Sequence, residues 1–254
     1  MSKLPKEHQF TDLSDYGRPI ARIIAKSLKS TRFTPIDVTI AFVISGLVGV
    51  YCIVEGYYWA AAFFLIVKSI LDAADGELAR VKETPSYTGR FLDSVSDIIL
   101  NFIILGTIGY LTNTHFGYIF LAFFGIQLQG TLYNYYYVIL RNRFEGDTTS
   151  RVFEDKTPVA LPGEKQKNVT ILFFIYKALY GIFDEIIYAL DKNAPEGKPF
   201  PNWLMTLIST FGLGFQLLII SVFLVLNLKE LIIPFFIGNS VLVFVFIGIR
   251  KIFY

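Results

Sequence analysis

The chain has 254 residues, of which 54% are hydrophobic and 17% are aromatic, and its formal net charge at pH 7 is only +2. Several apolar stretches reach the roughly 20 residues that a helix needs to cross a bilayer, so the composition indicates a polytopic membrane protein. The small net charge excludes nucleic acid as an expected partner, and the single cysteine, Cys52, excludes an internal disulfide and a thiolate zinc cluster.

Residues 1–35 are predicted to form a cytosolic N-terminus that contains an amphipathic helix. In DYGRPIARIIAKSLKSTRF, residues 15–33, apolar and basic residues alternate at helical spacing. This pattern is typical of a helix that lies on an anionic lipid surface. No apolar run precedes it, so we expect no cleavable signal peptide.

Residues 36–254 are predicted to form one all-α membrane domain with six transmembrane helices. A backbone in hydrocarbon must satisfy its own hydrogen bonds, which a helix does internally. By length and hydropathy, the spans are expected at about 36–54, 57–80, 89–113, 116–143, 203–226 and 231–250.

The basic residues predict the orientation of these spans. With the N-terminus in the cytosol, 21 of the 23 Lys and Arg residues lie on the cytosolic side or at its interface, and the exceptions are Lys68 and Lys229. This asymmetry follows the positive-inside rule. Both termini are therefore expected in the cytosol.

The segment 144–202 is predicted to be a cytosolic loop that contains an interfacial helix at about 169–190. Lys177, Asp184 and Glu185 interrupt the apolar residues of this helix. A seventh span is the competing interpretation, but it would place the basic C-terminal end of the chain outside.

The fourth predicted span ends in QLQGTLYNYYYVILRNR, residues 127–143, which contains a cluster of tyrosines. Tyrosines can cage a quaternary ammonium group. An aromatic belt at the membrane interface is the favoured interpretation, because Arg141 and Arg143 follow directly. The glycines of GLG, residues 212–214, are interpreted as a helix-packing site.

Four aspartates stand out against this apolar background, in DAADGELARVKETPSYTGRFLDSVSD. Asp72 and Asp75 are three residues apart near the end of the second predicted span, and Asp93 and Asp97 are four apart near the start of the third. Each spacing places its pair on a single helix face. Since the joining turn is short, the two helices should pack antiparallel with these faces opposed.

Four converging carboxylates favour a divalent cation. As bare anions in a low-dielectric site they would repel one another and take up protons. Oxygen ligands indicate Mg²⁺ or Mn²⁺ rather than zinc. A divalent cation transporter is the remote alternative, because intramembrane carboxylates can also line an ion pathway.

The neighbouring residues favour a phosphate-bearing ligand. Gly76 and Ala79 leave a patch without large side chains beside the carboxylates, and Arg80 supplies a phosphate-directed cation. Gly89 allows the third helix to start close to the second. Lys68, one turn before Asp72, is equally consistent with an ion pair to that aspartate and with a contact to substrate phosphate.

This motif resembles the signature of the CDP-alcohol phosphotransferase family, D-x2-D-G-x2-A-R-x8-G-x3-D-x3-D. Every fixed position is met, by Asp72, Asp75, Gly76, Ala79, Arg80, Gly89, Asp93 and Asp97. The resemblance extends to the six spans and the preceding basic helix, and loosely to Pro35 and Thr39 at the start of the first span.

The resemblance implies an enzyme that transfers a phosphoalcohol from a CDP-alcohol to an acceptor hydroxyl, with release of CMP, in phospholipid biosynthesis. It implies two divalent ions held by Asp72, Asp75 and Asp93, with Asp97 completing the metal site and deprotonating the acceptor. The nucleotide contacts that it implies are Thr39, Gly76, Ala79, Arg80 and Gly89.

The resemblance does not separate two classes of donor. CDP-diacylglycerol with a soluble alcohol acceptor is preferred, because the short six-span architecture resembles the prokaryotic members of that group. CDP-choline or CDP-ethanolamine with diacylglycerol is the alternative. The implied partners are a CDP-alcohol lipid donor, an alcohol acceptor and membrane lipids, with a homodimer left open, and the active site would face the cytosol.

Overall fold

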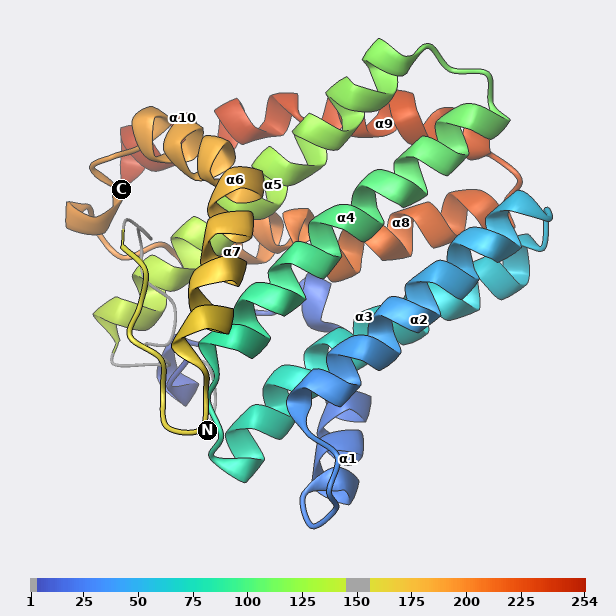
Figure 1. Cartoon of the computed structure of the whole chain (residues 1–254). Coiled ribbons are helices and arrows are strands. Elements are labelled where there is room, and N and C mark those ends of the chain that lie inside the picture. Colours follow the sequence, from blue (N-terminus) through green and yellow to red (C-terminus); the bar gives the residue numbers. More distant parts are fainter. Residues whose placement is uncertain (1–3, 145–155) are drawn as a thin grey trace.

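The computed structural model describes residues 4–144 and 156–254, and these residues form helices and no strand, as predicted (Figure 1). The helices are α1 (Arg18–Leu28), α2 (Pro35–Val54), α3 (Tyr58–Lys82), α4 (Tyr87–Leu111), α5 (Phe116–Arg143), α6 (Gln166–Leu190), α7 (Asn202–Ile208), α8 (Leu213–Val225), α9 (Ile232–Asn239) and α10 (Val241–Phe253). The chain also forms short 3-10 helices, among them η2 (Leu13–Asp15) and η4 (Ser209–Phe211).

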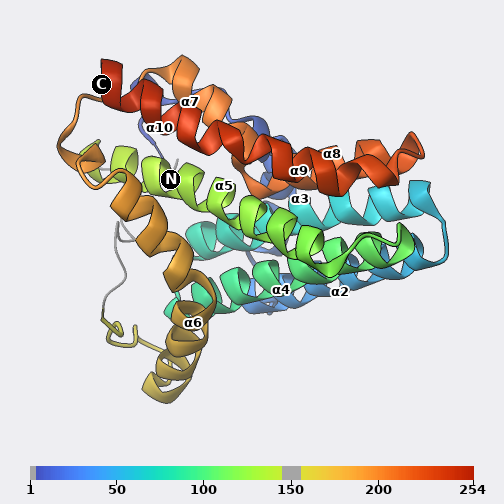
Figure 2. The ribbon, with the colours of Figure 1, turned by 90° about the horizontal axis from the view of Figure 1, so that it is seen from above.

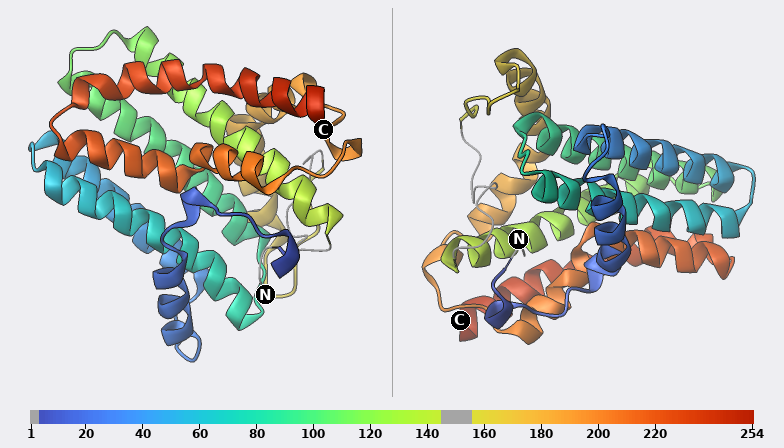
Figure 3. Two further views of the ribbon diagram at one scale, coloured as in Figure 1. Left: turned by 180° about the vertical axis from the view of Figure 1, so that it is seen from behind. Right: turned by 90° about the horizontal axis from the view of Figure 1, so that it is seen from below.

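The long helices run back and forth along one axis, as Figure 2 shows. Helices α2, α4 and α8 run in one direction, and α3, α5 and the pair α9 and α10 return in the other. The turns at 55–57, 112–115 and 226–231 gather at one end of this bundle, and the turn at 83–86 lies at the opposite end. Helices α1 and α6 lie toward this second end and cross the direction of the bundle (Figure 3).

The apolar helices indicate an integral membrane protein. Only some of the six predicted spans, however, are long and apolar enough to cross a membrane. Among the described residues, four helical stretches qualify: Pro35–Val54, Tyr87–Leu111, Phe116–Arg143 and Lys229–Phe253. A fifth is obtained if Asn202–Phe211 and Leu213–Val225, which meet at 55°, form one broken span. Helix α3 does not qualify, because charged residues interrupt its apolar sequence.

The fifth predicted span is thus not one straight helix. Its break falls at Gly212, where the N-terminal segment crosses the bundle. A Cβ atom added to Gly214 would lie 2.0 Å from the carbonyl oxygen of Ser14, and Leu13 N–H donates to Ser209 Oγ over 2.9 Å. The interpretation of these glycines as a packing site is confirmed, and the packing partner is η2.

The basic N-terminal segment forms α1, which packs against α3. Ala21 and Ala25 are buried and contact Ala74 and Leu78 in one small hydrophobic cluster. The opposite face exposes basic residues together with the apolar side chain of Ile23. Such a surface suits the predicted lipid interface.

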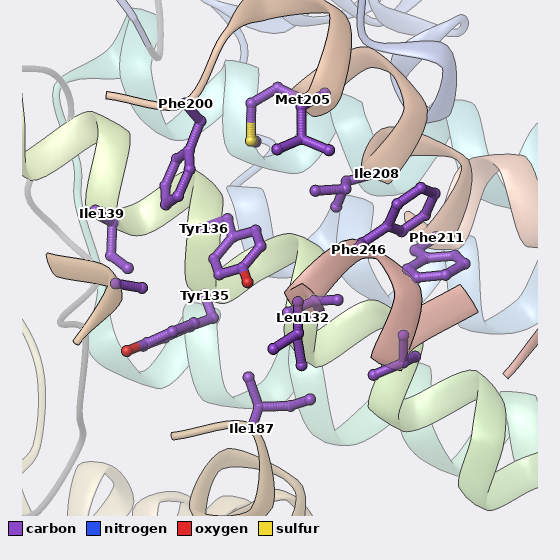
Figure 4. Close-up of a cluster of buried hydrophobic side chains, with 14 of the residues drawn as sticks. Leu132, Tyr135, Tyr136, Ile139, Ile187, Phe200, Met205, Ile208, Phe211 and Phe246 are labelled. Atoms are coloured by element: carbon purple, nitrogen blue, oxygen red, sulfur yellow. The ribbon is translucent and has the colours of Figure 1, made fainter. Parts of the chain in front are cut away.

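The prediction of an aromatic belt in α5 is wrong for two of its tyrosines, which lie inside the protein (Figure 4). The hydroxyl of Tyr136 donates to Asp191 Oδ2 over 2.6 Å, and that of Tyr135 donates to Asp191 O over 3.0 Å. Asp191 also forms a buried ion pair with Arg250. These polar contacts link the end of α6 to α5 and α10, so they satisfy tyrosine hydroxyls that a belt would expose to headgroups.

Helix α6 covers the predicted interfacial segment and is not among the candidate spans. It packs against α4 and α5, and crosses the bundle obliquely in Figure 2. Phe173 and Phe183 are buried on its inner face, while Phe174 and Ile182 are exposed. An exposed apolar face on a helix that crosses the end of the bundle fits the interfacial prediction.

Labelling tests whether α3 crosses the membrane. Cys52 is replaced by Ala so that a single introduced cysteine reacts, at Glu55→Cys in the α2–α3 turn or at Thr84→Cys in the α3–α4 turn. Both positions are exposed. We expect a membrane-impermeant maleimide to label the two variants from opposite sides of sealed vesicles. Labelling of both from the same side would contradict a spanning α3.

Candidate active site

The two helices that carry the aspartates are positioned by a third. Helix α2 packs against both α3 and α4, whereas α3 and α4 do not pack closely against each other along their lengths. The chain leaves α3 through Glu83, which adopts a left-handed conformation with φ of 56°. The aspartate helices are therefore antiparallel, as predicted, but their side chains rather than their backbones meet.

Three of the four predicted metal ligands come together. Asp72, Asp75 and Asp93 each offer a carboxylate oxygen, and these atoms all lie within 4.8 Å of one another. Among the described residues, no hydrogen-bond donor reaches the buried Oδ1 atom of Asp93. A buried oxygen without a donor is unfavourable unless a cation satisfies it. This set of oxygen ligands therefore fits a divalent ion such as Mg²⁺ or Mn²⁺.

Thr39 lies against this group. Its hydroxyl is 2.8 Å from Asp75 Oδ2 and donates to it, within a buried contact between α2 and α3. A hydrogen bond from a neighbouring side chain fixes the orientation of a ligating carboxylate. The structure thus places Thr39 behind a predicted metal ligand, whereas the resemblance implies a nucleotide contact.

Asp97, the fourth predicted ligand, is not part of the group formed by Asp72, Asp75 and Asp93. It forms an ion pair and a hydrogen bond with Lys68, whose Nζ atom also lies 3.4 Å from Asp72 Oδ2. The spacing along α3 predicts the contact between Lys68 and Asp72. The contact with Asp97 depends on how α4 is placed beside α3, and no sequence spacing reveals it.

Arg80 is held beside Gly76 by a carboxylate that the sequence analysis missed. Arg80 Nη2 lies 3.2 Å from Glu77 Oε1, and Arg18 of α1 binds the same oxygen over 2.6 Å. A Cβ atom added to Gly76 would lie 3.6 Å from Arg80 Nη2, so the guanidinium group lies close above this glycine. Ala79, one residue before Arg80, is half-buried on the same helix.

Gly89 belongs to the cap of α4. Its N–H donates to Ser86 Oγ over 2.9 Å, the usual arrangement for a serine N-cap. Glu164, from the loop before α6, accepts from the N–H of Thr88 over 2.7 Å and from Ser86 Oγ over 2.8 Å. Two side chains thus satisfy backbone donors at the start of the helix that carries Asp93.

The pKa of Glu164 lies below its usual value. Burial alone would raise this pKa, but hydrogen bonds from Thr88, Ser86 and Leu161 outweigh that effect because they favour the carboxylate. The negative charge also lies at the N-terminal end of α4, where the helix dipole favours it.

A tyrosine of α6 reaches the same part of α4. The hydroxyl of Tyr180 donates to Ser94 O over 3.1 Å. Burial, and then the nearby carboxylates of Asp97 and Asp93, raise the pKa of Tyr180 well above its usual value. The phenol therefore stays protonated, and α6 covers the side of α4 next to the aspartates.

Comparison with known proteins gives one family. The family model of CDP-alcohol phosphatidyltransferases matches residues 32–193, a range that contains all four aspartates. No curated protein matches the chain significantly.

The cap formed by Glu164 has a testable dependence on pH. Its folded-state pKa is lowered from the usual 4.5, so its contribution to stability is fully present above that pH and is lost as the pH falls through the folded-state pKa. We expect Glu164→Gln to destabilise the protein at pH 7 by about 1 kcal/mol, as loss of a helix cap does. Thermal unfolding in detergent should show the difference at pH 7 and a smaller one at pH 3.

Glu185→Gln is the matched control, because Glu185 is an exposed carboxylate on α6. It should leave the unfolding temperature unchanged at both values of pH. An effect of Glu164→Gln that is equally large at pH 3 would contradict the role of the charged carboxylate.

Proposed function

The chain belongs to the CDP-alcohol phosphatidyltransferase family, and from this premise we propose that it transfers the phosphatidyl group of CDP-diacylglycerol to the hydroxyl of a soluble alcohol. CMP is the second product. The observation that carries the proposal is the group formed by Asp72, Asp75 and Asp93, whose oxygens lie within 4.8 Å of one another. These residues occupy three of the four aspartate positions of the family motif.

Asp72, Asp75 and Asp93 would hold a divalent ion, Mg²⁺ or Mn²⁺, against the diphosphate of the donor. When bound, the ion supplies neutralisation of charge on the phosphate and on the departing nucleotide. Thr39 keeps the carboxylate of Asp75 in place. Arg80, held by Glu77, supplies a fixed positive charge for a phosphate oxygen.

The transfer is a displacement at the phosphorus atom of the lipid phosphate. The acceptor oxygen forms a bond to phosphorus, and the bond between phosphorus and the bridging oxygen breaks, so that CMP leaves with the electron pair. Asp97 takes the proton of the acceptor hydroxyl, which is the role of a general base. Its carboxylate lies next to this group of ligands without belonging to it.

The depth of the site suits one lipid and one polar substrate. Asp75 lies seven residues before the end of α3, or about 10 Å along the helix axis. The diacylglycerol part of the donor would enter from the bilayer, and the polar acceptor would enter from the end of the bundle where α1 and α6 lie. This end is the cytosolic one in our proposal, and both termini share it.

Purified protein, incubated with a panel of CDP-alcohols and acceptors, tests the function. We expect CMP release together with a lipid product from CDP-diacylglycerol, and loss of both after exhaustive chelation, with recovery on addition of Mg²⁺ or Mn²⁺. Turnover with CDP-choline or CDP-ethanolamine and diacylglycerol would favour the aminoalcohol alternative. Vesicle uptake of divalent cations without any CMP release would favour a transporter.

Asp97→Asn separates chemistry from donor binding. Asp72, Asp75 and Asp93 remain, so we expect the CDP-alcohol to bind with at most moderate weakening. The kcat should fall by a factor on the order of 10² or more, the usual scale for loss of a general base. Donor affinity and turnover are measured on the same preparation. A collapse of affinity with a near-normal kcat at saturation would make Asp97 a binding residue instead.

A further inference from the structure

Tyr16, just before α1, carries a buried hydroxyl group beside the candidate site. Among the described residues, no side chain or backbone group forms a hydrogen bond with this hydroxyl. Burial raises the pKa of Tyr16, and Ser69 and Lys68 of α3 lie close enough to act in the opposite direction. The phenol therefore stays protonated at neutral pH and can donate its proton. A buried hydroxyl without a partner is unfavourable unless a ligand or water satisfies it.

The segment that carries Tyr16 crosses the bundle before α1 begins (Figure 3). It is held on both sides of this residue. Before it, Tyr133 of α5 donates to Asp12 over 2.5 Å. After it, Arg18 binds Glu77 of α3 over 2.6 Å. These contacts fix the backbone around Tyr16, so the phenol has a defined position before any substrate binds, as a positioning group requires.

Tyr16 lies on the Asp97 side of the site. A Cβ atom added to the adjacent Gly17 would lie 2.8 Å from Ile70 Cγ1, so the chain here runs directly against α3. Ile70 lies twelve residues before the end of α3, or about 18 Å along the helix axis. The diphosphate of the donor would be bound nearer that end. Lys68, which adjoins the phenol, binds Asp97.

We propose that the hydroxyl of Tyr16 donates a hydrogen bond to the alcohol acceptor and positions it beside Asp97. The inference rests on the proposed function, in which Asp97 takes the proton of this acceptor. An alcohol oxygen has one proton and two lone pairs. One lone pair accepts from Tyr16, the proton faces Asp97, and the second lone pair forms the bond to phosphorus as CMP leaves. Tyr16 keeps its own proton throughout.

Tyr16→Phe removes only the hydroxyl group, so steady-state kinetics of the full chain test the inference. The acceptors are serine, glycerol 3-phosphate and inositol phosphate, each with CDP-diacylglycerol and Mg²⁺. For the acceptor that supports CMP release, we expect KM to rise about 3-fold to 10-fold, the range for one neutral hydrogen bond. The kcat and the affinity for CDP-diacylglycerol should change by less than about two-fold, because the bond is present both before and during the transfer.

The outcomes separate this inference from the function on which it rests. No CMP release by the wild type with any of the three acceptors would contradict the proposed function, and the inference with it. An active wild type and an unchanged acceptor KM in Tyr16→Phe would overturn the inference alone. Loss of affinity for CDP-diacylglycerol in Tyr16→Phe would also overturn it, because Tyr16 would then contact the donor.

Tyr58→Phe is the matched control, because the hydroxyl of Tyr58 accepts from Lys229 over 2.7 Å at the opposite end of the bundle. It should leave the acceptor KM unchanged, and a rise equal to that of Tyr16→Phe would contradict a specific contact. Thermal unfolding in detergent tests for a merely structural role. The hydroxyl of Tyr16 has no partner among the described residues, so Tyr16→Phe should not lower the unfolding temperature. A lower temperature would indicate a structural hydrogen bond and overturn the inference.

Discussion

The repulsion among carboxylates inside a membrane domain is the constraint on which the rest of the structure depends. Asp72, Asp75 and Asp93 place their oxygens within 4.8 Å of one another, at a depth where water cannot screen them fully. Such a group is stable only with cations. Lys68 supplies one positive charge beside Asp72 and Asp97, and the oxygens of Asp72, Asp75 and Asp93 have the spacing of metal ligands.

This constraint explains why α3 is the least apolar of the long helices. The residues that serve the site interrupt its hydrophobic sequence, so α3 must be shielded by its neighbours. It packs against α1, α2 and α8, and Leu65 and Leu78 are completely buried among them. Helix α2 also contacts α4 and so fixes the separation between the two aspartate helices.

Hydropathy and motif spacing predicted the parts of the structure that depend on local sequence. The positions of the long helices and the grouping of Asp72, Asp75 and Asp93 follow from apolar runs and from the short turn between α3 and α4. The contacts of Lys68 with Asp97 and of Glu164 with the start of α4 were not predictable. They join residues 29 and 76 positions apart, so they depend on tertiary packing and not on helical periodicity.

The tyrosines of α5 also show that local sequence does not predict tertiary contacts. Local sequence favoured an aromatic belt, because tyrosines beside arginines are typical of a membrane interface. Asp191 and Arg250 lie far along the chain, yet they bury Tyr136 by giving its hydroxyl a charged partner. A sequence pattern within one segment does not predict a hydrogen-bond partner that belongs to another helix.

Ion pairs link the N-terminal segment to the candidate site. Arg18 at the start of α1 binds Glu77, and Glu77 binds Arg80. The segment before α1 is anchored in turn, because Ser14 packs against Gly214 and Tyr133 donates to Asp12 over 2.5 Å. Since α1 cannot move relative to α3 without disturbing Glu77, the orientation of Arg80 depends on how this helix is seated. A lipid surface that holds α1 in place would therefore also fix the guanidinium group of Arg80 beside Gly76.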